Sequence, residues 1–186
     1  MSVTKVEIVN MALRLLGVER INDLTDNNKR AQVMSDLYDL CRREVLCDAD
    51  WSFARKRQTI SPLATTPTFG WDYEFNRPSD CLQILEEYNG EDYQAEGTLI
   101  MADVNALSLV FTKNETDTSK FSAGFNVALA HKLAHKACFS LINDKTKEDR
   151  LEKSYAEAIA NARFQNSKEN PPQDPEIESF TFDVRG

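Results

Sequence analysis

Two histidines spaced four residues apart are the best candidates for metal chemistry in this chain. His131 and His135 bracket the run His-Lys-Leu-Ala-His, and on a helix this spacing places both imidazoles on one face, as in zinc hydrolases. Those hydrolases carry a glutamate directly after the first histidine as general base, whereas this chain has Lys132 there. No third histidine exists to complete a ligand set. The sequence therefore predicts no metal site and favours paired histidines at a surface or an interface.

Other catalytic patterns are equally weak. The chain has no G-x-S-x-G motif, and its six glycines form no phosphate-binding loop. The acidic pairs Glu86-Glu87 and Glu91-Asp92 flank the turn signal Asn89-Gly90, where solvated charge is the expected role. The four cysteines form no Cys-x-x-Cys pair, which indicates reduced structural thiols. We predict no catalytic residue, no cofactor and no enzymatic activity.

The single basic cluster is Arg55-Lys56-Arg57, in a chain with a net charge of −8 and a pI of about 4.9. An acidic chain is expected to bind nucleic acid weakly, because proteins bind nucleic acid by neutralising its phosphates. Acidic groups that line a channel would instead repel a duplex and let it pass. The basic run predicts a contact with another subunit or with DNA, and the sequence leaves both open.

The C-terminal segment, residues 167–186, carries the clearest binding signal. Pro171, Pro172 and Pro175 stiffen a spacer, and a period-two pattern of apolar residues follows it without a second strand to pair with. We predict an arm that docks on another protein, by adding a strand to a sheet edge or by filling a groove. A frayed chain end is the alternative. The predicted docking residues are Ile177, Phe180, Phe182, Val184 and Arg185.

Helical periodicity defines four segments that would carry these residues. The first begins at the capping box of Thr4 and Glu7 and ends at Gly17. The second begins near Thr25 or Asp26 and ends near Asp48. The third covers residues 121–141 and is rich in alanine, which indicates a domain core or a subunit contact, and the fourth begins at residue 146.

Between the second and third helices the apolar period changes from helical to alternating. Strands are expected at residues 71–75, 81–88, 98–101 and 107–112. The predicted fold class is therefore mainly α: a four-helix bundle with a small antiparallel β insertion and an extended C-terminal arm. We predict a helical domain over residues 1–166, with the insertion at about 68–113, and a docking arm over 167–186.

The order of motifs resembles the head-to-tail adaptor proteins of short-tailed bacteriophages, of the tail tubular protein A or gatekeeper-ring type. The resemblance extends from about Val6 to Phe164. Each motif alone is ordinary packing, and their order and spacing make the pattern specific. The motifs are Ala-Leu-Arg-Leu-Leu-Gly at 12–17, Trp-Ser-Phe-Ala-Arg at 51–55, Trp-Asp-Tyr-Glu-Phe at 71–75, Pro-Ser-Asp-Cys-Leu at 78–82, and residues 125–137.

The resemblance implies a structural virion protein at the head–tail junction, made in the host cytoplasm. Such adaptors form a ring of twelve copies beneath the portal protein, extend the DNA channel and support the tail or nozzle protein, and a C-terminal extension commonly reaches toward the portal. DNA would pass without specific binding, and no membrane would be involved, because no apolar run in the chain is long enough to span one. Two alternatives stay open: a phage-encoded hydrolase acting during infection, centred on the histidine pair or an acidic pair, and a non-viral interaction module.

Overall fold

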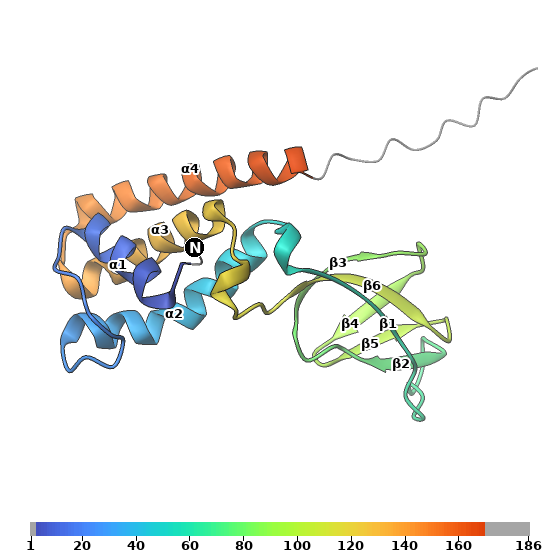
Figure 1. The fold of residues 1–186 in the computed structure, drawn as a ribbon. Helices are drawn as coiled ribbons and strands as arrows, with labels where there is room; N and C mark the ends of the chain where they lie inside the picture. Colours follow the sequence, from blue (N-terminus) through green and yellow to red (C-terminus); the bar gives the residue numbers. More distant parts are fainter. Residues whose placement is uncertain (1–2, 170–186) are drawn as a thin grey trace, which may run out of the picture.

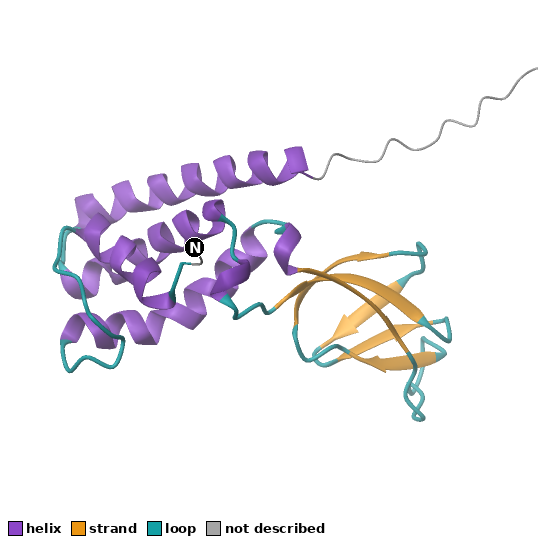
Figure 2. Cartoon of the chain, in the orientation of Figure 1, coloured by secondary structure: helices purple, strands orange, loops and turns teal. Residues whose placement is uncertain are grey.

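A computed structural model describes residues 3–169 of the chain, and side chains up to residue 165. The described chain forms a helical lobe and a β lobe that lie side by side, and the chain enters and leaves the β lobe between α2 and α3 (Figures 1 and 2). The helices are α1 (Lys5–Leu16), α2 (Lys29–Asp48), α3 (Ala123–Leu141) and α4 (Lys145–Glu169), with short 3-10 turns η1 (Ser52–Ala54) and η2 (Thr118–Lys120). The strands are β1 (Arg55–Ile60), β2 (Tyr73–Asn76), β3 (Cys81–Glu87), β4 (Tyr93–Glu96), β5 (Leu99–Ala102) and β6 (Leu107–Lys113).

The ends of α1 follow from its local sequence. The Thr4 hydroxyl accepts from the Glu7 backbone N–H at 3.2 Å, and the Glu7 carboxylate accepts from the Thr4 N–H at 2.7 Å. Gly17 ends the helix with a φ of 70°, a left-handed conformation that favours glycine. Both predicted ends are therefore confirmed.

Helix α2 begins later than the sequence predicted. Its N-cap is Asn28, whose side chain accepts from the Ala31 N–H at 3.0 Å. The earlier candidates are occupied in a turn, because Asp23 accepts from the Thr25 N–H and Asp26 accepts from the Asn22 N–H. Carboxylates that bond to nearby backbone in this way compete with helix formation.

Helix α3 is the centre of the helical lobe. It packs against the other three helices, and its small residues allow close contact (Figure 1). A Cβ built on Gly124 would lie 3.2 Å from the Ala162 Cβ on α4, so the two backbones approach closely there. Of the two roles expected for this alanine-rich helix, the structure supports the domain core. Its fully or almost fully buried residues are Phe125, Ala128, Leu129, Ala130, Leu133, Ala134, Ala137 and Cys138.

The β lobe consists of two three-stranded antiparallel sheets with strand orders β1-β6-β3 and β2-β5-β4. Phe75 from the second sheet and Phe111 from the first are both fully buried, and they pack in one apolar cluster that is separate from the core of the helices. Two facing sheets with a shared core form a structural unit in their own right. The other buried members of this cluster are Ile60, Ile100, Ala102, Leu107 and Leu109.

This architecture overturns the predicted fold class. Strands take up 20% of the structure and helices 48%, so a six-stranded β component is too large to be a small insertion in a helical bundle. The prediction missed β1 and β4. Both are edge strands, and β1 has the sequence Arg-Lys-Arg-Gln-Thr-Ile, with a single fully apolar side chain. β1 has mostly charged and polar side chains, and β4 alternates over only four residues, so both form mainly through backbone pairing with their neighbours and have a weak sequence signal.

A cluster of aromatic side chains lies in the helical core where the chain passes between the two lobes. The Trp51 and Phe125 rings pack edge to face with centroids 5.0 Å apart, and Phe53 lies 5.1 Å from Phe125. Phe121 adds a ring 4.6 Å from Phe125. The Trp51 indole N–H donates to the Val45 carbonyl at 2.8 Å, which satisfies its polar atom. The cluster therefore holds both chain crossings between the lobes against the helical core.

Candidate partner-binding surface

The C-terminal docking residues predicted from the sequence lie outside the described residues. Helix α4 continues to Glu169. Docking through the C-terminal arm stays a prediction. These residues are Ile177, Phe180, Phe182, Val184 and Arg185.

The basic run forms β1, an edge strand of its sheet. Strand alternation leaves Arg55 and Arg57 exposed and turns Lys56 toward the lobe. The Lys56 ammonium lies 2.9 Å from an Asp80 carboxylate oxygen and 5.5 Å from the centroid of the Phe111 ring. Lys56 thus joins β1 to the start of β3 and covers the apolar cluster.

The two arginines of the run also have partners within the chain. The Arg55 guanidinium lies 3.0 Å from an Asp50 carboxylate oxygen, and Arg57 lies 5.7 Å from the centroid of the Tyr88 ring. Partly exposed pairs of this kind contribute little to stability. The run therefore has partners within the chain at a sheet edge, and a contact with DNA or another subunit stays a prediction.

The histidine pair lies on α3, and both side chains are half-buried. Burial lowers the pKa of His131 below its ordinary value of 6.5, and the nearby Glu157 carboxylate partly opposes this. The Nδ1 atom of His131 is buried and has no hydrogen-bond partner within the described part of the chain. Within residues 3–169, no group of three or more His, Cys, Asp or Glu side chains is placed to hold a metal ion.

Lys132, which stands where zinc hydrolases have their general base, belongs to an ionic network between helices. Its ammonium lies 3.0 Å from Glu44 and 3.6 Å from Asp48 on α2, and 4.6 Å from the centroid of the Tyr155 ring on α4. The Tyr155 hydroxyl donates to Asp48. Burial raises the pKa of Glu44, but Lys132 and Lys136 outweigh it and hold that pKa below its ordinary value. Lys132 therefore fastens α2, α3 and α4 together.

One of the acidic residues beside the β3–β4 turn is buried rather than solvated. Glu87 is 9% exposed, and its carboxylate accepts from the Glu91 N–H at 2.8 Å and from the Ser108 N–H at 3.2 Å. These bonds hold the turn against β6. The acidic pairs are therefore not equivalent, and Glu87 has a structural role.

A buried arginine that the sequence did not single out joins α2 to the segment between β6 and α3. Arg42 is 4% exposed, and its guanidinium donates to the Asn114 side-chain carbonyl at 2.8 Å and to the Glu115 backbone carbonyl at 2.6 Å. Asp39 lies 3.5 Å from it on the same helix. Only the fold brings these residues together, since 72 positions separate Arg42 from Asn114.

Glu115 completes this junction as a buried carboxylate that is 4% exposed. Lys113 and Lys120 lie 3.2 Å and 3.1 Å from it, and the backbone N–H groups of Thr116 and Asp117 each donate to it at 3.1 Å. Burial raises its pKa, but the backbone N–H of Asp117 and the two lysines outweigh this and hold the pKa of Glu115 below its ordinary value of 4.5.

We expect Glu115→Gln to lower the free energy of unfolding at neutral pH by about 1–3 kcal/mol, because charge-assisted bonds are lost at a buried site. A depressed pKa in the folded state means that the unfolded chain takes up the proton first as the pH falls. The contribution of Glu115 is therefore present above pH 4.5 and is lost as the pH falls through its folded pKa. Urea unfolding of both proteins, at neutral pH and below that value, should show a smaller acid destabilisation in the variant. Glu152→Gln, at an exposed position on α4, is the control and should leave both values unchanged.

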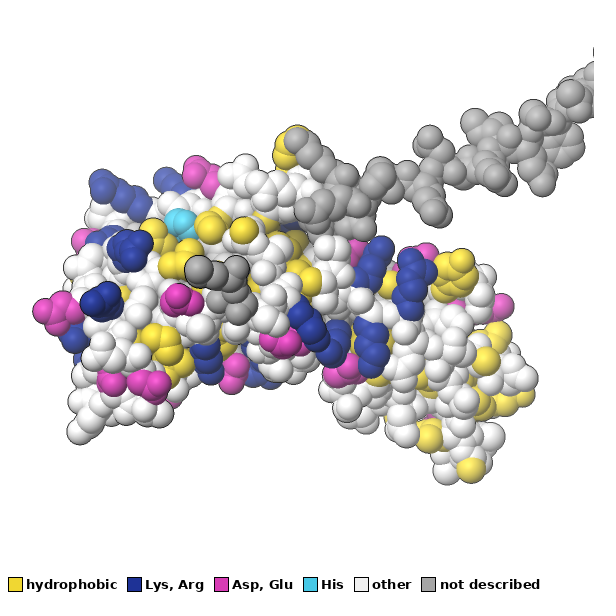
Figure 3. Space-filling model, viewed as in Figure 1, with side chains coloured by type: hydrophobic (Ala, Val, Ile, Leu, Met, Phe, Trp, Pro, Cys, Tyr) yellow, Lys and Arg dark blue, Asp and Glu magenta, His cyan; other side chains and the backbone are white. Residues whose placement is uncertain are grey.

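An apolar groove runs between α1 and α3 on the outside of the helical lobe. We call it the α1–α3 groove; it has a volume of about 160 Å³. Val127 is 42% exposed in it. On the face shown in Figure 3, hydrophobic side chains gather beside a histidine on the helical lobe, with Lys and Arg side chains along the neighbouring edge. The groove is lined by Met11, Arg14, Leu15, Val127, Ala130 and His131.

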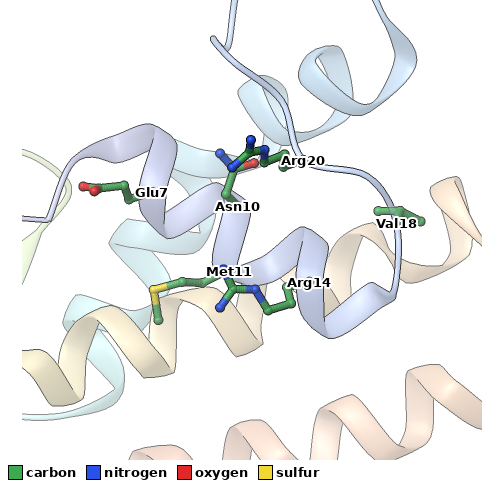
Figure 4. A pocket seen from close by; sticks show the side chains of 6 residues that line it. All are labelled: Glu7, Asn10, Met11, Arg14, Val18 and Arg20. Carbon is green, nitrogen blue, oxygen red and sulfur yellow. The ribbon is translucent and has the colours of Figure 1, made fainter.

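A second hollow of about 440 Å³ continues from this groove around α1, since both are lined by Met11 and Arg14. Figure 4 shows Met11 and Arg14 side by side on one flank of α1, with Asn10 and Arg20 on the opposite flank. Asn10 is held by two hydrogen bonds of 2.9 Å to the backbone of Ile21. Among the described residues, neither arginine side chain has an ion-pair or hydrogen-bond partner. The groove thus combines open apolar surface with the positive charge of Arg14, and Glu7 also lines the adjoining hollow.

This groove is a candidate surface for a partner. No sequence pattern indicates it, because its residues come from two helices more than a hundred positions apart. No helix among residues 3–169 is both long and apolar enough to cross a membrane. No family model matches the chain, and no curated protein matches it.

Proposed function

We propose that this protein is a structural subunit of a bacteriophage head-to-tail connector. Twelve copies would form a ring at the head–tail junction of the virion, bound on one side to the portal protein and on the other to the tail or nozzle protein. The subunit has no catalytic role and needs no cofactor. It acts by docking and by extending the DNA channel.

The observation that carries this proposal is the order and spacing of the adaptor-like motifs along the chain. The structure adds that motifs distant in the sequence are packed against one another. Trp51 and Phe53 of the second motif pack on Phe125, which opens the last motif. Such packing accounts for why these two motifs occur together in this chain.

The ionisable groups of the described residues also fit a structural role. The candidate general-base position is taken by Lys132, which bridges helices, and the buried Glu87 and Glu115 bind backbone N–H groups. A net charge of −8 on each copy suits a channel through which DNA slides, because like charges repel the duplex and prevent sticking.

Deleting residues 171–186 from the full chain is expected to abolish binding to the portal protein of the same phage while leaving the fold intact. The described apolar cores lie between Ile8 and Ala162, so the deletion removes none of their residues. Negative-stain images of the intact protein mixed with portal should show a twelve-fold ring, and the truncated protein should show none. Circular dichroism should be the same for both proteins.

A matched pair of variants separates the apolar pattern from the length of the arm. Replacing both Phe180 and Phe182 by serine should prevent assembly of the twelve-fold ring. Each phenylalanine side chain contributes about 1.5–3 kcal/mol when fully buried, and twelve docking sites act together. Replacing Thr181 and Asp183 with serine changes the alternate positions and should leave the ring unchanged. Normal docking of the truncated protein would contradict the role of the arm.

A further inference from the structure

The α1–α3 groove is an apolar surface with nothing seated on it among the described residues. Val127 is 42% exposed, and Met11 and Leu15 are half-buried beside it. Arg14 lies at the edge of the groove and has no acidic partner among residues 3–169, while Arg20 and Glu7 line the adjoining hollow. A surface with this composition suits an apolar segment that carries negative charge.

The chain itself contains such a segment beyond the described residues. Residues 170–186 hold four carboxylates and one arginine, a net side-chain charge of −3, and Phe180, Phe182 and Val184 stand at alternate positions. Phe180 and Phe182 supply two rings for the apolar floor, while Glu178 and Asp183 supply negative charge for Arg14 at its edge. The segment and the groove therefore complement each other in polarity and in sign.

We propose that residues 177–185 dock in the α1–α3 groove of a neighbouring copy of this chain. The inference deepens the proposed function, since it names the partner of the arm within the ring. Each subunit would then supply one arm and one groove, and the same contact repeated head to tail would close the ring.

The geometry of α4 favours a neighbouring copy over the same chain. Helices α3 and α4 run antiparallel, with Gly124 against Ala162, so the end of α4 extends beyond the start of α3 (Figure 1). From Glu169 to position 177 the chain can cover about 25 Å at 3.1 Å per residue in the extended form that prolines favour. A reversal directly after α4 would be needed to seat the segment in its own groove.

The test places a photo-crosslinking phenylalanine analogue at position 182 of the full chain. Isotopically light and heavy copies are mixed at high concentration, irradiated and digested. We expect crosslinks from position 182 to peptides that contain residues 11–18 or 127–131, with light and heavy copies joined to each other. Crosslinks confined to one copy, or directed to any other surface, would overturn the proposal.

Two variants test the groove directly. Val127→Glu places a carboxylate on the apolar floor and should reduce the crosslink yield by about tenfold, which corresponds to the loss of a modest apolar contact. Arg14→Glu, at an exposed position, should lower the yield in the same direction. The control is Phe139→Glu, on the same helix but outside the groove at 66% exposure, and it should leave the yield unchanged. Equal yields from Val127→Glu and Phe139→Glu would sink the proposal.

Mixing each variant with portal distinguishes this inference from the proposed function. If Val127→Glu forms a normal ring on portal, the groove is not the docking site, and the connector function still stands. If copies crosslink through the groove but no ring forms on portal, the docking site stands and the connector function fails.

Discussion

Phe75→Ala is expected to unfold the β lobe while the helical lobe stays folded. Phe75 is fully buried in the cluster that the two sheets share, and that cluster is separate from the core of the helices. Truncating a buried phenylalanine costs about 3–5 kcal/mol, which is a large part of the stability of a small lobe. Hydrogen exchange followed by mass spectrometry should show lost protection in residues 55–113 and retained protection in α1 and α3.

Phe69→Ala is the matched control for this prediction. Phe69 belongs to the same lobe, in the connection from β1 to β2, but it is 86% exposed. Its replacement removes no core contact and should leave exchange unchanged. Equal loss of protection in both lobes of Phe75→Ala would show that the lobes unfold as one unit. The two apolar cores would then not define two independently unfolding units.

Phe125→Ala is expected to destabilise the whole described structure rather than one lobe. Phe125 is fully buried, and its ring contacts Trp51, Phe53 and Phe121. Its loss leaves a cavity beneath both chain crossings, with a cost of about 3–5 kcal/mol plus the edge-to-face ring contacts. Thermal and urea unfolding should both shift strongly, and protection from exchange should fall in both lobes.

The control is Phe139→Ala, since Phe139 lies on the same helix and is 66% exposed. It separates the loss of the ring cluster from the loss of any phenylalanine side chain on α3. A shift for Phe125→Ala no larger than that for Phe139→Ala would mean that the aromatic cluster does not hold the lobes together.

Much of the helical lobe could be predicted because its signals are local. The Thr4 capping box and Gly17 set the ends of α1 within a few residues of backbone, and the apolar stripe of α3 marks a helix that is buried on most sides. The predicted start of α2 is wrong, because hydrogen bonds in the preceding turn compete with the helix. The start of α2 moved to Asn28, because Asp23 and Asp26 are engaged in the preceding turn.

The β lobe was harder to predict because its size depends on pairing at a distance. Strands β2, β3, β5 and β6 carry apolar residues that mark them in the sequence. The mostly polar β1 and the four-residue β4 form mainly through pairing with their neighbours in the sheet. Arg55 pairs in register with Thr112, and Tyr93 with Ala102. Without β1 and β4, the sequence predicts only one small sheet between the helices. The predicted fold class is wrong for this reason.

The candidate binding residues also fall into two groups, those marked by local sequence and those brought together by tertiary packing. The sequence by itself determined that the C-terminal segment alternates Phe180, Phe182 and Val184 behind a proline-rich spacer, since that pattern needs no other part of the chain. Only the tertiary structure decided which charges are free, because it paired Lys56 with Asp80 and left Arg14 open beside an apolar groove. It also buried Arg42 and Glu115 together across more than seventy positions. Capping and turn signals act over a few residues. Burial and ion pairing are set when distant segments pack, so local sequence patterns do not specify those contacts.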